Sequence, residues 1–124
     1  ELIDVLEHLE NPWQMLRDVR AGAEYLVIRQ PLLTSLSTFR NSTYRSQRED
    51  LGHIAFYDVR QFKEMAYACG WEPLKLDLLA LWEWPVNKGM RAPWWKKALV
   101  NWNRELMSYI MSGFYLNGAF KRRV

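Results

Sequence analysis

Cysteine and long apolar runs are almost absent from this sequence of 124 residues. The single cysteine, Cys69, excludes an internal disulfide and a cluster of thiolate ligands around a metal. No apolar run reaches the roughly 18 residues that a membrane-spanning helix requires. We therefore expect a protein of a reducing, cytoplasmic compartment.

Acidic residues are scarce in the last third of the chain. Residues 84–124 carry 8 basic and 1 acidic side chains, a net charge of +7, whereas residues 1–83 carry 9 basic and 13 acidic ones, a net charge of −4. The basic part also holds four of the seven tryptophans. It is either a helix that packs its tryptophans on the core, or a surface for an anionic partner such as membrane headgroups. We favour packing, which predicts buried side chains at Trp95, Leu99, Trp102 and Leu106.

The composition is that of one folded domain, with 49% hydrophobic and 15% aromatic residues. The alternation of patterns predicts an α/β sheet with helices on its faces, and a ligand crevice at the carboxyl ends of its strands. Residues 34–50 are rich in Ser, Thr, Asn and Arg without periodicity, which predicts a long polar loop beside that crevice. Strands are expected over residues 1–5, 24–29, 71–82 and 114–120, and helices after Pro12, from Asp58 to Cys69 and over residues 95–109.

The second of these strands contains four successive apolar residues, Tyr25–Ile28. Such a run is typical of a parallel strand that is buried on both faces. We expect it to pair in parallel with the first strand, and we expect Pro31 to end it, because proline cannot donate to a sheet.

The most informative segment is D-V-L-E-H-L-E-N-P, residues 4–12. It places two acids, Asp4 and Glu7, and the histidine His8 within about one turn of backbone. The expected strand ends here, so the three side chains should face the crevice. Asn11 can cap the next helix and Pro12 suits its first position.

This motif, the helix and strand after it, and the later phrases His53-Ile-Ala-Phe-Tyr and Ala66-Tyr-Ala-Cys-Gly-Trp resemble the second half of class I S-adenosylmethionine-dependent methyltransferases. The resemblance covers residues 1–82 and leaves residues 83–124 as a basic, Trp-rich helical tail in which a last strand is expected. It implies a Rossmann-like sheet without its glycine-rich N-terminal half. We therefore expect a truncated methyltransferase domain, a fragment that is inactive alone.

The resemblance also implies site residues. In this family the backbone at the end of the fourth strand of the sheet touches the methionine part of the cofactor. The first strand expected here corresponds to that fourth strand, which implies cofactor binding by Leu2, Ile3 and Asp4. Ubiquinone-pathway O-methyltransferases and small-RNA 2′-O-methyltransferases bind a divalent cation through an acid–x–x–acid–His set, and the RNA enzymes add a second histidine. The implied ligands of a divalent cation such as Mg²⁺ are Asp4, Glu7, His8 and His53.

The same two histidines have a second interpretation. Without a metal, His8 or His53 would be catalytic as the general base that takes the acceptor's proton. In a third interpretation, Glu7 and His8 only hydrogen-bond backbone at the start of the helix.

The predicted function is S-adenosylmethionine-dependent O-methylation of a small-molecule hydroxyl. The alternatives are methylation of an RNA 2′-hydroxyl, and a non-catalytic interaction or membrane-surface module that uses the basic tail. The sequence carries no RNA-binding motif that would support the RNA alternative. No DNA partner is expected.

Overall fold

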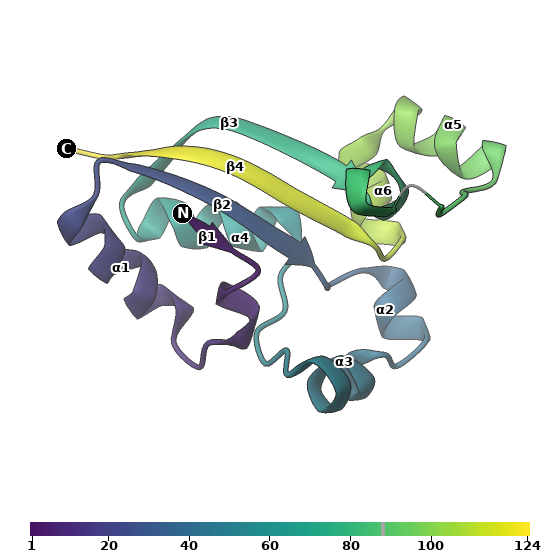
Figure 1. The fold of residues 1–124 in the computed structure, drawn as a ribbon, viewed down its shortest axis with the longest axis horizontal. Helices are drawn as coiled ribbons and strands as arrows, with labels where there is room; N and C mark the ends of the chain where they lie inside the picture. The colour runs from purple at the N-terminus through teal and green to yellow at the C-terminus, as the bar shows by residue number, and fades with distance from the viewer. Residues whose placement is uncertain (88) are drawn as a thin grey trace.

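The computed structural model describes residues 1–87 and 89–124 and shows one four-stranded mixed sheet (Figure 1). The strand order is β1-β2-β4-β3, in which β1 and β2 are parallel and the other neighbours are antiparallel. The strands are β1 (Leu2–Ile3), β2 (Tyr25–Leu32), β3 (Trp71–Ala80) and β4 (Phe114–Arg122). The fold is thus α/β, as predicted.

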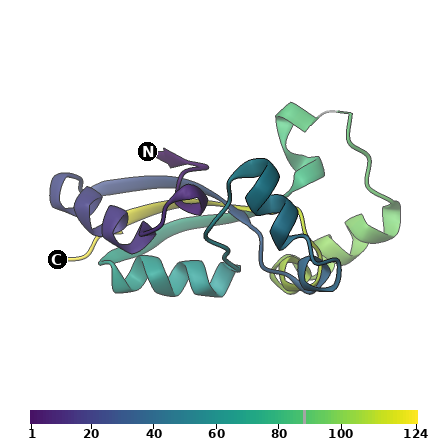
Figure 2. The ribbon, with the colours of Figure 1, turned by 90° about the horizontal axis from the view of Figure 1, so that it is seen from below.

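Two helices cover one face of this sheet. α1 (Pro12–Gly22) connects β1 to β2, and α4 (Val59–Ala68) precedes β3; both lie on the same side of the strands (Figure 2). The remaining elements gather at the end of the sheet where β1 and β2 finish (Figure 1). They are η1 (Leu6–His8), α2 (Leu36–Arg40), α3 (Tyr44–Leu51), η2 (Leu81–Glu83), η3 (Pro85–Asn87), α5 (Trp94–Trp102) and α6 (Arg104–Ile110).

The parallel pairing of the first two strands is confirmed, with Leu2 opposite Ile28 and Ile3 opposite Arg29. The prediction that Pro31 ends β2 is wrong, because the strand continues to Leu32. Arg29 turns its carbonyl toward β1, where it accepts from Asp4 N at 3.1 Å. Pro31, two residues later, turns its backbone nitrogen to the same side of the strand. β1 has already ended there, so the missing N–H removes no hydrogen bond from the sheet.

The covered face of the sheet holds the core. Along β4 the buried residues alternate, and Leu116 and Phe120 point toward the helices. Phe62 of α4 is fully buried and meets Phe120 edge-on, with 6.3 Å between ring centroids. Gly118 lies between these two β4 residues, and a Cβ there would sit 2.4 Å from the Phe120 ring. The glycine therefore lets the phenyl ring lie flat against the strand.

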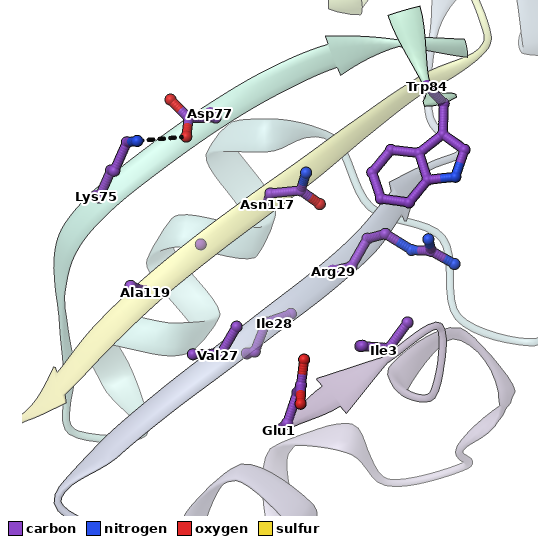
Figure 3. Close-up of a pocket in the computed structure, with 11 residues that line it drawn as sticks. Glu1, Ile3, Val27, Ile28, Arg29, Lys75, Asp77, Trp84, Asn117 and Ala119 are labelled. Carbon is purple, nitrogen blue, oxygen red and sulfur yellow. Dashed lines mark ion pairs between the residues drawn. The ribbon is translucent and has the colours of Figure 1, made fainter. Parts of the chain in front are cut away.

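The other face of the sheet is bare, so the expectation of a strand covered on both faces is wrong. Tyr25 and Val27 of β2 are exposed, while Leu26 and Ile28 are buried. Figure 3 shows this open face, with a hollow of about 340 Å³ between Val27, Trp84 and Asn117. The apolar run in β2 is thus an alternating strand whose outer side chains also happen to be apolar.

The polar loop expected over residues 34–50 contains two helices, α2 and α3. Ser35 caps α2, since its hydroxyl accepts from Thr38 N at 3.1 Å. α3 buries no residue and ends at Gly52, whose φ of +69° is the left-handed conformation that glycine favours. A helix without an apolar face leaves no periodicity in the sequence, which explains the wrong prediction.

The predicted single helix over residues 95–109 is broken at Asn103 into α5 and α6. The Asn103 side chain accepts from Leu106 N at 3.0 Å and so starts a new helix. The predicted packing of the tail is also wrong. Its four marker side chains are 39–71% exposed: Trp95, Leu99, Trp102 and Leu106. None of the helices in the described part of the chain is long and apolar enough to cross a bilayer.

We predict that Phe62→Ala lowers the free energy of unfolding by about 3–5 kcal/mol, because it opens a cavity between α4 and the sheet. Chemical denaturation followed by circular dichroism measures the change. Phe39→Ala is the matched control, since Phe39 is 73% exposed on α2 and its loss should change stability by less than about 0.5 kcal/mol. Equal effects of the two substitutions would contradict this assignment of the core.

Candidate functional site

The candidate site begins at a sharp turn directly after β1. Asp4 has a φ of +51°, which turns the chain away from the sheet and into the short 3-10 helix η1. Its backbone stays attached to the sheet through the hydrogen bond from Asp4 N to Arg29 O. Glu7 and His8 therefore stand at the carboxyl end of β1, as the motif predicts.

A second segment, residues 52–55, folds back onto this turn. The carbonyl of Glu7 accepts from Ile54 N at 2.8 Å and from Ala55 N at 3.0 Å. His8 Nδ1 lies 3.1 Å from the carbonyl oxygen of Gly52. These three contacts bring His53 beside His8 although 45 residues separate them, and the ring centroids are 4.8 Å apart.

The hydrogen bonds fix which nitrogen of each imidazole carries its proton. Gly52 O can only accept, so His8 Nδ1 donates to it. His53 Nδ1 lies 2.9 Å from Oε1 of Gln47, which is likewise an acceptor. Both histidines thus keep Nε2 available, which is the arrangement of metal-binding and general-base histidines.

Glu7 is buried to 1% exposure beside these rings. Burial raises the pKa of its carboxyl group, although its own backbone, His8 and Gln30 oppose that shift. Glu7 Oε1 lies 3.9 Å from His8 Nε2, while Oε2 is buried without a hydrogen-bond partner. The neighbouring Gln30 is also buried with its Oε1 unpaired. Two buried oxygens that lack a donor favour a proton or a cation bound to at least one of them.

The pKa of His53 moves in the opposite direction. Partial burial lowers it, and the nearby His8 lowers it further. His53 therefore stays neutral at a pH where an ordinary histidine starts to take up a proton. A neutral imidazole can accept a hydrogen bond or ligate a cation through Nε2.

One oxygen of Glu7 and one nitrogen each of His8 and His53 lie within 4.8 Å of one another. The structure thus brings together three of the four residues that the sequence implies as metal ligands. The fourth, Asp4, is paired with Arg29, which donates through Nε at 3.0 Å and through Nη2. Arg29 in turn lies against Trp84 and Tyr115, with its guanidinium carbon 4.6 and 5.6 Å from the ring centroids.

A cavity of about 490 Å³ opens next to these residues. Asp4, Glu7, His8 and His53 all line it, together with polar side chains of α2 and α3 and the connection between them. The expectation that the motif and the polar segment share one crevice is therefore confirmed. The volume is that of a small-molecule site.

The three residues implied as cofactor-binding lie at different places. Leu2 faces the buried core, and Ile3 lies exposed on the open face of the sheet. Asp4 lines the cavity. The three residues share the backbone at the end of β1. That backbone lies next to this cavity and next to the hollow on the open face of the sheet.

Sequence reasoning missed the residues that hold this site in place. Arg29, Gln30 and Gln47 contact or adjoin Asp4, Glu7 and His53 in turn. A signal existed for the first two, since a charged and an amide residue directly follow the apolar part of β2. The sequence contains no comparable signal for Gln47, because its role depends on the helix that carries it.

Known proteins give a fold but no sequence relative. No protein-family model and no curated protein matches the chain. A crystal structure from Bacillus halodurans C-125, described as a "putative methyltransferase", superposes with a TM-score of 0.59 at 12% identity. The alignment covers 98% of this chain and 62% of the other. This chain therefore shares the fold of that structure, and it spans a little less than two thirds of that structure's length.

We predict that Glu7→Gln raises the free energy of unfolding by about 1–3 kcal/mol at neutral pH, because an amide removes a buried charge and can donate to Gln30 Oε1. The raised pKa means that the native state binds more protons than the unfolded state above 4.5, the ordinary value for Glu. Wild-type stability therefore falls as the pH rises through the raised pKa, and the advantage of the variant grows.

Urea denaturation across this pH range, in the presence of a chelator, measures the difference. Glu10→Gln serves as control, since Glu10 is an exposed carboxylate in the same motif. A Glu7→Gln protein that is less stable than wild type throughout would show that the carboxylate makes favourable contacts in the folded state.

Proposed function

We propose that this chain forms the acceptor side of an S-adenosylmethionine-dependent methyltransferase that methylates a hydroxyl group of a small molecule. The observation that carries the proposal is the convergence of Glu7, His8 and His53 in one cavity, at the end of a strand in a methyltransferase-like fold. S-adenosylmethionine supplies an electrophilic methyl carbon when bound. The residues of this chain have to place an oxygen lone pair in line with it and remove the oxygen's proton.

His8 is the better general base of the two histidines. Its Nε2 is free to take the proton, and the Glu7 carboxylate 3.9 Å away stabilises the positive charge that results. Burial and the nearby His8 both lower the pKa of His53, so this neutral ring suits a hydrogen-bond acceptor that orients the hydroxyl. Gly52 and Gln47 hold the two rings in these orientations through Nδ1.

The same three residues fit a divalent cation. One carboxylate oxygen and two imidazole nitrogens suit Mn²⁺ or Zn²⁺, and Mg²⁺ if water completes its shell. The unpaired buried Oε2 of Glu7 is the observation that favours such a ligand. A bound cation would lower the pKa of the acceptor hydroxyl, and Asp4 would stay with Arg29.

The 124 residues contain no glycine-rich strand-to-helix turn, so we expect them to contact only part of the bound methyl donor. We predict that this chain alone binds S-adenosylmethionine weakly or not at all. A protein in which it is joined to a glycine-rich N-terminal half should bind at micromolar strength, about −8 kcal/mol. Calorimetry on both proteins measures the difference, and equal affinities would mean that the donor site lies within residues 1–124.

We predict that, in the same complete protein, His8→Ala lowers methyl transfer to a small-molecule hydroxyl acceptor by about 10²–10⁴-fold, the usual contribution of a general base. Ser46→Ala, which also lines the cavity, should change the rate only slightly. A chelator distinguishes the two mechanisms. Loss of activity in both tests indicates a metal, loss through His8→Ala alone indicates a general base, and activity in both tests leaves Glu7 and His8 with a structural role.

A terminal 2′-hydroxyl of RNA is the second candidate acceptor. The observation that favours it is the second histidine, His53, beside Glu7 and His8. Methyl transfer to a short RNA but not to the same RNA with a 2′-deoxy end would replace the small-molecule proposal.

A further inference from the structure

The helix α5 has no partner on most of its surface. It belongs to the connection between β3 and β4, residues 81–113, and lies at one end of the molecule beyond α6 (Figure 1). Its only buried residue is Val100. Trp94 is 81% exposed and Trp102 is 71% exposed, which is unusual for the largest apolar side chain.

The exposed apolar residues of α5 form one continuous face. At about 100° per residue, Trp94, Ala98, Trp102, Trp95 and Leu99 follow one another around an arc of about 140°. Val100 lies outside this arc and packs on the protein. The face is therefore turned to solvent while the opposite side of the helix holds α5 to the fold.

Basic residues flank this face. Lys96 and Lys97 border the arc on its two sides, and Lys96 Nζ lies 5.5 Å from the Trp95 ring. No acid occurs between Glu83 and Glu105, and that stretch carries five basic residues. Arg104 is paired with Glu83, so it adds little to the field. Lys121 and the two arginines after it lie at the opposite end of the sheet and are not part of this surface (Figure 1).

We propose that α5 docks on an anionic lipid surface, with its tryptophan face at the headgroup level. Tryptophan combines a large apolar ring with a polar N–H and is the residue that favours the membrane interface. A rim of lysines complements anionic headgroups. The same charges would repel the α5 helix of a second copy, so self-association is disfavoured. The proposal stands independently of methyl transfer.

Docking through α5 would also place the cavity near the lipid. Both ends of the connection that carries α5 line the cavity, through Leu81 at its start and Ser112 and Gly113 at its finish. A chain held on the membrane by this connection therefore keeps the residues that line the cavity tethered to the surface.

The test uses the whole chain with vesicles made of equal parts phosphatidylglycerol and phosphatidylcholine. We expect co-sedimentation with these vesicles and a blue shift of tryptophan fluorescence, both of which weaken with added salt. Vesicles of phosphatidylcholine alone should bind far less protein. Lys97→Gln should weaken binding about fivefold, the equivalent of about 1 kcal/mol per basic residue, whereas Lys121→Gln at the other end should not.

Trp94→Ala with Trp102→Ala should abolish the binding, while Trp13→Ala, at an exposed tryptophan of α1, should leave it unchanged. Far-UV circular dichroism establishes that each variant is folded. The proposal is overturned if anionic vesicles do not bind, or if binding is the same with neutral vesicles. A dimer in the absence of lipid that Trp102→Ala dissociates would also overturn it and identify a second copy as the occupant.

Discussion

The candidate site depends on the attachment of residues 52–55 to the turn after β1. Two backbone donors on the Glu7 carbonyl and one histidine donor on the Gly52 carbonyl make this attachment. Without it, Glu7 and His8 would stand at the end of a two-residue strand, and no backbone contact would hold residues 52–55 against them. The attachment also explains why His8 presents Nε2, since its Nδ1 is used on Gly52. The Nδ1 atom of His53 is used on Gln47 of α3 instead.

The cost of this arrangement is a buried carboxyl group. The backbone carbonyl of Glu7 accepts the two hydrogen bonds that hold the turn in place. Its carboxylate lies in the site and keeps one oxygen unpaired. Asp4, three residues earlier, differs from Glu7 because its carboxylate is neutralised by an ion pair with Arg29 at the surface of the sheet. One motif thus supplies a satisfied acid that fixes the turn and an unsatisfied acid that faces the histidines. A buried carboxyl group whose pKa is raised by burial is typical of functional sites.

The sequence predicts the elements whose signals are local. Asp58 and Gln61 form the capping box that starts α4, and the parallel pair β1–β2 follows from the apolar strand and the helix between them. It does not predict the break at Asn103, although Asn is a favoured N-cap, because the apolar residues on both sides of it keep helical spacing. Nor does it predict which way α5 faces, since apolar residues at helical spacing describe a core helix and a surface helix equally well.

The direction of α5 shows what periodicity leaves undetermined. A hydrophobic stripe on a helix indicates that something apolar covers it. What covers the stripe depends on where the helix begins and ends. Here the ion pair of Arg104 with Glu83 and its bond to Leu78 O fix α6 at the end of the sheet. Because Val100 packs inward, the five residues opposite it point away from the fold. The chain therefore leaves the apolar face of α5 outside, on the connection whose two ends also line the cavity.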